Sequence, residues 1–274
     1  MPEIAEVETV RQTLKKQIVG KRIKSVNVIY ERIIESDLQE FKHCLKGLVV
    51  NDILRKGKWL LFDIGDYYLC SHLRMEGKYF IKNQDDPVVK HEHVIIEFDD
   101  GVQLRYHDTR KFGRMNLVLK KNIDSVEGVR KQGIEPIDDK LTKEYLFEHF
   151  KKRKLPMKTL LLDQTIISGL GNIYADEVLF GAKINPLKLG INITLEECQR
   201  IVSSAKRIIQ EAIKYGGTTI KSYTSSLGVT GRFQEKLMVH KRENEKCKLC
   251  GTIIKRIVVG GRSTYYCEKC QKDS

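Results

Sequence analysis

The sequence lacks the features that would place it in a membrane or in an export pathway. No apolar run approaches the roughly 20 residues that a helix needs to cross a bilayer. The N-terminus holds Glu3, Glu6 and Glu8, whereas a secretory signal peptide begins with a basic segment and continues with an apolar one. Internal repeats and low-complexity tracts are also missing. We therefore expect a folded protein that works in the cytoplasm.

Acidic residues are too few to balance the basic ones. The chain has 274 residues, of which 49 are Lys or Arg and 36 are Asp or Glu, so the formal net charge is +13. The calculated pI is about 9.3. A basic excess of this size favours a polyanionic partner such as nucleic acid. Charge alone leaves open the alternative of a basic protein without such a partner.

The cysteines do not form an obvious disulfide framework. Cys44, Cys70 and Cys198 are scattered and odd in number, which fits a reducing cytosol. Four more lie near the end of the chain with the spacing Cys-x2-Cys-x16-Cys-x2-Cys, and they are Cys247, Cys250, Cys267 and Cys270. This spacing is typical of a structural site that holds one Zn²⁺ tetrahedrally through four thiolates. The alternative, two disulfides, requires an oxidising compartment.

The segment between the two cysteine pairs predicts a β-hairpin. It carries β-branched residues between positions 253 and 259, then Gly260-Gly261, then Thr264, Tyr265 and Tyr266. Arg262 directly follows the glycine turn. A metal bound by the cysteines would thus rigidify a hairpin that projects one arginine.

The first half of the chain predicts a helix followed by strands. Apolar residues recur at helical spacing from Ile4 to Ile18, and Gly20 ends the run. Short strand-like runs follow with turns between them, which predicts an antiparallel β-sandwich. These runs are residues 23–30, 59–64, 67–73, 78–81, 93–98, 102–106 and 115–119.

The pattern becomes helical beyond a candidate linker at residues 133–136. Residues 157–164 and 173–180 predict two helices around a glycine-containing turn at 168–172. Thr194 and Glu197 form the sequence of a capping box before a long helix that Gly216-Gly217 ends. A helix that starts at a glycine turn can bind phosphate, although an ordinary helical hairpin would have the same pattern.

The N-terminus offers a possible nucleophile. Removal of Met1 would leave Pro2 with a secondary amine, and α-amino groups titrate near ~8. Such an amine can form an iminium with an electrophilic carbon without any cofactor. Glu3 and Glu6 could move protons beside it if burial raises their pKa. The alternative is an ordinary N-terminus, since many proteins begin with Met-Pro.

Together these segments resemble the formamidopyrimidine-DNA glycosylases. The resemblance covers essentially the whole chain, in order. The motifs that carry it are Met1-Pro2-Glu3-x-x-Glu6-Val7-Glu8-Thr9, Lys56-Gly57-Lys58-Trp59-Leu60, Ser71-His72-Leu73-Arg74-Met75-Glu76-Gly77, Asp108-x-Arg110-Lys111-Phe112-Gly113, Leu162-Asp163-Gln164, Gly169-Leu170-Gly171-Asn172-Ile173-Tyr174-Ala175-Asp176-Glu177 and the four-cysteine segment.

The resemblance implies an α+β protein with three domains. Residues 1–132 would form the catalytic β-sandwich domain with its N-terminal helix, residues 133–239 a helix-two-turn-helix DNA-binding domain, and residues 240–274 the zinc finger. The family removes oxidised purines, namely 8-oxoguanine and formamidopyrimidines, from duplex DNA. It then cleaves the strand by β,δ-elimination. We accordingly expect a bacterial, nucleoid-associated monomer whose partner is double-stranded DNA with oxidised bases or abasic sites.

The resemblance also implies roles for individual residues. Pro2 would attack C1′ of the damaged nucleotide, Glu3 would protonate the opening sugar, Lys58 would assist elimination, and Arg262 would hold the lesion phosphate. Further DNA contacts would come from His72, His91, Arg110, Arg153 and Asn172. Lesion recognition would use Glu6, Glu76, Thr218, Thr219 and Tyr223.

Three residues match the wedge with which the family fills the gap left by a flipped base. Met75 and Phe112 would stack in the gap, and Arg110 would pair with the orphaned base. Without the resemblance, core packing would explain Met75 and Phe112 equally well, and a surface salt bridge would explain Arg110.

The chain departs from the family pattern at a few positions. Ile4-Ala5 replaces Leu-Pro, Lys221 replaces an arginine, and Ser263 and Tyr265 replace Gly and His. None of these changes removes a catalytic group. Two alternatives remain: an endonuclease VIII-type enzyme for oxidised pyrimidines, and a non-catalytic DNA-binding zinc protein. The Pro2-Glu3 start and the Arg110–Gly113 segment favour the purine-specific enzyme.

Overall fold

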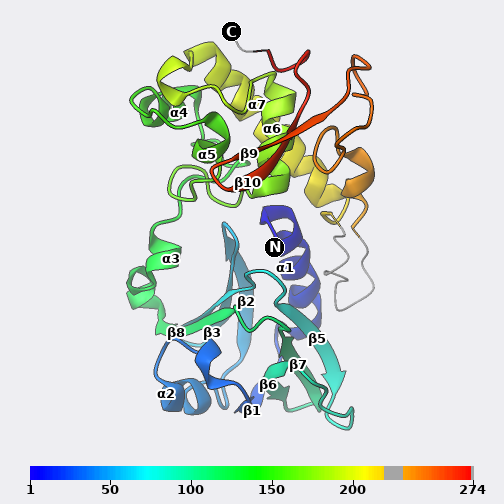
Figure 1. The fold of residues 1–274 in the computed structure, drawn as a ribbon. Helices are drawn as coiled ribbons and strands as arrows, with labels where there is room; N and C mark the ends of the chain where they lie inside the picture. Colours follow the sequence, from blue (N-terminus) through cyan, green and yellow to red (C-terminus); the bar gives the residue numbers. More distant parts are fainter. Residues whose placement is uncertain (219–230, 273–274) are drawn as a thin grey trace. The chain divides into compact units, whose positions relative to one another are not determined.

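The structure, a computed structural model, describes residues 1–218 and 231–272 (Figure 1). The chain divides into two compact units, Met1–Arg130 with Gly216–Gly231 and Lys131–Tyr215 with Arg232–Ser274. We call them the first unit and the second unit. Within the described ranges, no helix is long and apolar enough to cross a membrane.

The first unit contains the β-sandwich that the strand pattern predicts. One antiparallel sheet has the order β1-β6-β7-β5 and the other has the order β2-β3-β4-β8. Side chains such as Phe62, Phe98 and Leu104, each 1 % exposed, form the core of this unit. The strands are β1 (Ile23–Val28), β2 (Val50–Lys56), β3 (Trp59–Ile64), β4 (Tyr67–His72), β5 (Lys78–Asn83), β6 (Glu92–Phe98), β7 (Val102–His107) and β8 (Arg114–Leu119).

Two loops pass between the sheets at the same edge of the sandwich. The Met75 loop (residues 73–77) joins β4 to β5, and the Phe112 loop (residues 108–113) joins β7 to β8. Their ends are paired, because His72 lies opposite Arg114 and Lys78 lies opposite His107. The topology therefore brings the two loops together.

Helix α1 (Ile4–Ile18) has the bounds that its apolar pattern predicts. Its residues Val7, Leu14 and Ile18 are fully buried, and the helix packs on β2 and β3. Gly20, with φ of +86°, allows the chain to leave the helix. The shorter helices of this unit are η1 (Glu31–Ile33), α2 (Leu38–His43), η2 (Lys120–Ser125) and α3 (Glu127–Arg130).

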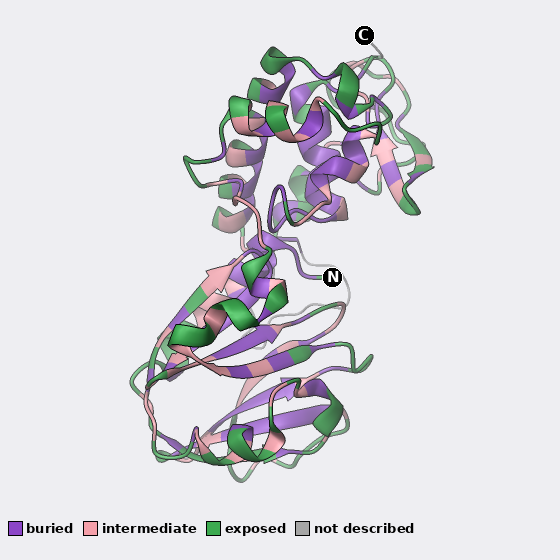
Figure 2. Cartoon of the chain, turned by 90° about the vertical axis from the view of Figure 1, so that its left-hand side faces the viewer, coloured by how far each residue is buried: buried purple, intermediate pink, exposed green. Residues whose placement is uncertain are grey.

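The second unit is helical and carries one hairpin. Its elements are α4 (Lys143–Phe150), α5 (Met157–Leu161), α6 (Asn172–Ala182), η3 (Gly190–Asn192), α7 (Leu195–Lys214), η4 (Phe233–Lys236), β9 (Lys255–Val259) and β10 (Arg262–Tyr266). Helix α6 packs on α7 and is buried along most of its length. Figure 2 shows buried residues, in purple, on several helices of this unit.

The predicted cap of α7 is confirmed, whereas the predicted end of α5 is wrong. Thr194 Oγ1 accepts the N–H of Glu197 at 3.1 Å, and the Glu197 carboxylate accepts the N–H of Thr194 at 2.9 Å. Helix α5 stops at Leu161 rather than at Gln164. The Gln164 amide instead donates to the carbonyl of Leu170 at 2.7 Å and thereby closes the turn before α6.

Candidate functional site

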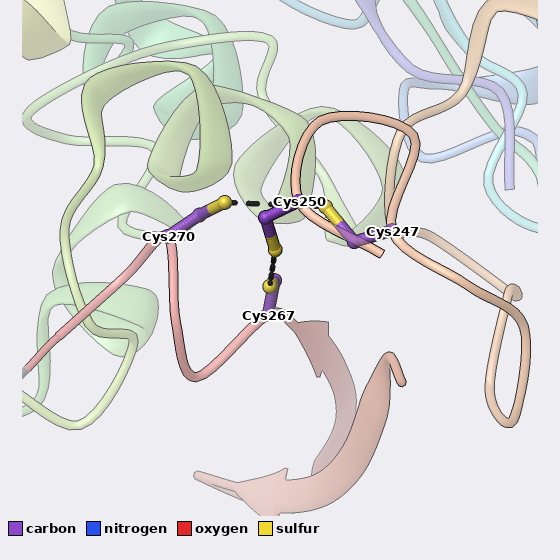
Figure 3. Close-up of side chains that lie close together, drawn as sticks. All are labelled: Cys247, Cys250, Cys267 and Cys270. Carbon is purple, nitrogen blue, oxygen red and sulfur yellow. Dashed lines mark hydrogen bonds between the residues drawn. The ribbon is translucent and has the colours of Figure 1, made fainter. Parts of the chain in front are cut away.

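The four C-terminal cysteines form a metal site. Their sulfur atoms lie within 4.8 Å of one another (Figure 3). The Cys247–Cys270 pair is 3.9 Å apart and the Cys250–Cys267 pair 3.4 Å. A tetrahedron with Zn–S bonds of about 2.3 Å has sulfur atoms about 3.8 Å apart, so the site fits Zn²⁺. All seven cysteines of the chain are free thiols, and the disulfide alternative is therefore wrong.

The zinc site supports the hairpin that carries Arg262. Strands β9 and β10 pair in register, with Val259 opposite Arg262. Gly260 and Gly261 between them have φ of +56° and +73°, as a two-residue hairpin turn with positive φ at both positions requires. The predicted glycine turn is confirmed, and Arg262 is exposed directly beyond it.

A hydrogen bond joins the hairpin to the start of α6. Asn172 Nδ2 donates to the carbonyl of Ser263 at 2.8 Å, and β10 packs against α6. Among the described residues, the Oδ1 atom of Asn172 is buried and has no hydrogen-bond partner. The N-terminal end of a helix carries a partial positive charge, which favours an anion near it. Because the resemblance predicts that Asn172 and Arg262 contact phosphate, we call these two residues and this helix start the phosphate-contact cluster.

Buried charges, which the sequence analysis missed, hold this cluster in place. Lys158 donates to the Asp176 carboxylate at 2.6 Å and to the Asn172 carbonyl at 2.9 Å. His240 Nδ1 lies 2.7 Å from the other Asp176 oxygen, and the His240 ring packs edge-on against Tyr265. In the sequence, Lys158 stands in an otherwise largely apolar segment, between Met157 and Leu160, and this was the signal that could have identified it as a buried charge.

Glu177 anchors the chain that leads into the zinc finger. Its carboxylate accepts the backbone N–H groups of Met238, Val239 and His240 at 2.8 to 2.9 Å. Burial raises the pKa of Glu177, although these three donors stabilise its charged form. Arg153, a predicted DNA contact in the same unit, is exposed.

The predicted catalytic residues Pro2 and Glu3 lie at the start of α1 in the first unit. Pro2 is buried and Glu3, the N-cap residue of α1, is 3 % exposed. The Glu6 carboxylate accepts the N–H of Glu3 at 2.9 Å. It also accepts the N–H of Thr218 at 2.7 Å and the Thr218 hydroxyl at 3.0 Å. Two predicted lesion-recognition residues therefore meet beside the N-terminus.

Lys58 lies in the turn between β2 and β3 and is 5 % exposed. Arg55 supports this turn, because its guanidinium donates to the Gly57 carbonyl at 3.1 Å and to Glu8 at 2.8 Å. Burial alone would raise the pKa of Glu8, but hydrogen bonds from Arg11 and Arg55 lower it to about 2. Glu8 and Arg55 are further supporting residues that the sequence analysis did not assign.

His72 is held as a neutral imidazole. Burial, together with the positive charges of Arg74 and Lys58, lowers the pKa of His72 to about 3. The backbone N–H of Arg74 donates to His72 Nδ1 at 3.0 Å, so the ring proton belongs on Nε2. A neutral ring with an N–H at Nε2 can donate a hydrogen bond to a phosphate oxygen.

The three predicted wedge residues lie on the two neighbouring loops of the sandwich. Phe112 is 49 % exposed, so the alternative of core packing does not account for its ring. The Arg110 guanidinium lies 4.7 Å from the centre of the Phe112 ring. Met75 is partly buried on the adjacent loop. His91, a predicted DNA contact, has φ of +74°.

The remaining predicted lesion-recognition residues have different outcomes. The Glu76 carboxylate accepts the hydroxyl of Thr109 and so joins the two loops. Thr219 and Tyr223 lie outside the described residues.

The departures from the family pattern also have different outcomes. Lys221 lies outside the described residues. The Ile4-Ala5 departure is accommodated, because both side chains are fully buried in α1. At Ser263, the group that holds Asn172 is the backbone carbonyl, which any residue provides.

Three consecutive parts of the chain match families of known proteins. Residues 1–115 match the formamidopyrimidine-DNA glycosylase N-terminal domain, and residues 132–224 match the H2TH domain of the same enzymes. Residues 244–272 match the zinc finger found in FPG and IleRS. The chain belongs to the formamidopyrimidine-DNA glycosylase family. The four cysteines are accordingly the ligands of a structural zinc finger.

Individual relatives are similar over their full length. A formamidopyrimidine-DNA glycosylase of Bacillus cereus is 45 % identical over 273 residues, which are 99 % of each chain. That of Lactobacillus delbrueckii subsp. bulgaricus is 44 % identical over 272 residues, covering 99 % of this chain and 100 % of the relative.

Solved structures of the family superpose closely on this one. Lactococcus lactis Fpg (MutM) in complex with N7-benzyl-Fapy-dG DNA has a TM-score of 0.93 at 41 % identity. The L. lactis enzyme with abasic-site DNA and MutM with carbocyclic 8-oxo-G DNA each have a TM-score of 0.93 at 40 % identity. All three alignments cover 99 % of this chain and 100 % of the other.

Proposed function

We propose that the protein excises 8-oxoguanine and formamidopyrimidines from duplex DNA and then cleaves the strand at the resulting abasic site. The observation that carries this proposal is that Pro2 and Glu3 are buried and lie beside the Glu6–Thr218 hydrogen bonds. The substrates named for the related structures support it, since they include Fapy-dG, 8-oxo-G and abasic-site DNA.

The first chemical step uses Pro2 and Glu3. After removal of Met1, the neutral amine of Pro2 attacks C1′ and forms a C–N bond, while the bond from C1′ to the damaged base breaks. The base leaves with the bonding electron pair and takes up a proton, while the Pro2 nitrogen loses the proton that it carried as an amine. Glu3, as a carboxylic acid, donates a proton to the ring oxygen as the sugar opens. The product is an iminium between Pro2 and the open sugar.

Strand cleavage follows from the iminium, which acts as an electron sink. Loss of a C2′ proton expels the 3′ phosphate, and a second proton loss then expels the 5′ phosphate. Lys58 is positioned by the supported β2–β3 turn to assist elimination. Arg262 and Asn172 hold the phosphate next to the lesion, so that the leaving group is bound as its charge develops.

The basic charge and the phosphate-contact cluster support binding to double-stranded DNA mainly through the DNA backbone. We also propose that the protein binds as a monomer. We further propose that the protein acts in the bacterial cytoplasm at the nucleoid. The bacterial relatives support this location, as does the fact that none of the seven cysteines forms a disulfide.

A cleavage panel tests the substrate class. Duplexes with one 8-oxoguanine, one Fapy-guanine, one oxidised pyrimidine or one undamaged guanine are incubated with an excess of enzyme, and strand breaks are counted. The proposal expects the two purine lesions to be cut at least tenfold faster than the pyrimidine lesion. Preference for the oxidised pyrimidine would favour the endonuclease VIII-type alternative, and binding without cleavage would favour the non-catalytic one.

A further inference from the structure

One buried hydroxyl group lies against both loops that carry the proposed wedge residues. Tyr106 is on β7, is 1 % exposed, and packs against Tyr79 of the neighbouring strand. A Cβ atom placed on Gly77 of the Met75 loop would lie 2.3 Å from the Tyr106 hydroxyl oxygen. One placed on Gly113 of the Phe112 loop would lie 1.7 Å from it. Only glycine lets both loops close on this hydroxyl.

Asp108 extends this contact through the Phe112 loop. Its carboxylate is fully buried and accepts the Tyr106 hydroxyl at 3.4 Å. The same oxygen accepts the backbone N–H groups of Phe112 at 3.0 Å and Gly113 at 2.8 Å. The other oxygen accepts the N–H of Arg110 at 3.0 Å. Both wedge residues of this loop are thus bound, through their backbone, to the carboxylate that Tyr106 contacts.

The two loops also have a link at the surface and unusual backbone conformations. Thr109 of the Phe112 loop donates its hydroxyl to Glu76 of the Met75 loop. Arg74 and Lys111 have φ of +52° and +58°, a region that residues with a side chain rarely adopt unless their surroundings hold them there. The loops are therefore built to keep one conformation.

We propose that Tyr106 is a positioning residue for base flipping. Its hydroxyl fixes the Met75 loop and the Phe112 loop relative to each other, so that Met75, Arg110 and Phe112 enter the duplex as one rigid group. A rigid group loses little conformational freedom when it inserts, whereas independently moving loops would have to be ordered at that moment. The inference rests on the proposed function, because it assumes that a damaged base leaves the stack.

The role of Tyr106 should depend on the substrate. Flipping a paired lesion requires unstacking and unpairing, which an abasic site does not require. A change that loosens the wedge should therefore slow excision of a paired base and leave cleavage of an abasic site nearly unaffected. A change that damages the fold should slow both reactions.

The test compares Tyr106→Phe with Tyr79→Phe as a matched control. Tyr79 is also buried, and its hydroxyl donates to Ser71 at 2.7 Å, but among the described residues it makes no hydrogen bond to either loop. Single-turnover rates are measured on an 8-oxoguanine:C duplex and on a duplex with an abasic site opposite C. Fluorescence of 2-aminopurine placed next to the lesion follows unstacking.

Tyr106→Phe should slow excision and the fluorescence change roughly fivefold, as expected for the loss of one buried hydrogen bond. Abasic-site cleavage should change less than about twofold, and Tyr79→Phe should change both rates less than about twofold. Thr109→Val gives an independent variant, since Thr109 is exposed and loses only its contact with Glu76. It should slow paired-lesion excision about two- to threefold, less than Tyr106→Phe does, because a surface hydrogen bond contributes less.

Equal losses on the two substrates, or a Tyr79→Phe variant as slow as Tyr106→Phe, would overturn the inference while leaving the proposed function intact. If Tyr106→Phe does not fold, a Thr109→Val variant with wild-type excision would overturn it. A wild-type protein that releases no base would overturn the proposed function itself, and this inference with it.

Discussion

The carboxylate of Glu6 joins the first turn of α1 to Thr218, which lies 212 positions away along the chain. One oxygen accepts both the N–H and the hydroxyl of Thr218, and the other accepts the N–H of Glu3. A Cβ on Gly217 would lie 2.7 Å from the Glu6 carboxylate, so glycine is required for this approach. Glu3, beside the proposed nucleophile, and Thr218, a predicted lesion-recognition residue, therefore both depend on the Glu6 side chain.

Glu6→Gln should slow base excision about tenfold. Glutamine keeps one acceptor oxygen, so either Glu3 or Thr218 loses its partner, and an unsatisfied buried donor costs about 1–3 kcal/mol. Single-turnover excision and urea unfolding measure the two effects. Glu196→Gln is the charge-matched control, because the Glu196 side chain is 86 % exposed. Glu6→Gln excision as fast as that of the control would contradict this dependence.

Arg262→Gln should weaken DNA binding in a salt-dependent way. If Arg262 neutralises one phosphate, its loss should make the slope of log affinity against log salt shallower by about 0.9. Lys183→Gln is the matched control, since Lys183 is exposed at the opposite end of α6 from Asn172. Thr218→Val should leave the slope unchanged. Equal slopes for Arg262→Gln and wild type would mean that Arg262 does not neutralise a DNA phosphate.

Zinc removal should act on DNA binding through Arg262. Metal analysis should find one zinc per chain, because the four sulfur atoms fill a tetrahedral site. Chelation should lower the affinity of the wild type for duplex DNA more than that of Arg262→Gln, which has already lost the contact. Affinities are measured by fluorescence anisotropy before and after chelation. An equal loss in both proteins would show that the zinc finger supports binding by another route.

The neutral state of His72 in the folded protein should make stability depend on pH. The folded protein holds the pKa at about 3, below the unfolded value of about 6.5, so the unfolded chain binds the proton first. Above pH 6.5 the titration of His72 leaves the free energy of unfolding unchanged. As the pH falls from 6.5 toward 3, the free energy of unfolding decreases by up to about 1.4 kcal/mol per pH unit.

His72→Asn isolates this contribution. Asn Oδ1 can accept the Arg74 N–H in place of Nδ1, but it does not titrate. Urea unfolding at pH 7 and pH 5 should show the difference in stability between wild type and variant shrinking by about 2 kcal/mol. A difference that stays constant between these pH values would show that His72 titrates normally in the folded protein.

Strong local patterns allowed much of the fold to be predicted from the sequence. The period of α1, the capping box of α7 and the cysteine spacing each specify their element within a few residues. β2 was missed, because it carries Asn51-Asp52 and a register shift between Val50 and Asp52, which interrupt the alternation of a strand. α2, with six residues, is too short to show a helical period.

The supporting residues of the site could not be predicted in the same way. Asp176 and His240 are 64 positions apart and meet only in the folded chain. Tyr106 looks like an ordinary core tyrosine in its strand, and only the approach of Gly77 and Gly113 to its hydroxyl distinguishes it. Such contacts depend on tertiary structure, whereas the proposed catalytic residues Pro2 and Glu3 are recognisable from their place at the N-terminus.

The central claim is that the amine of Pro2 forms a covalent Schiff base with the damaged nucleotide. Borohydride reduction during the reaction with an 8-oxoguanine duplex, followed by proteolysis and mass spectrometry, tests it most directly. The account predicts one cross-linked peptide, with the sugar remnant on the nitrogen of Pro2, and no cross-link when an N-terminal extension blocks that amine. A cross-link on Lys58 or another lysine, or undiminished trapping by the extended protein, would contradict the account.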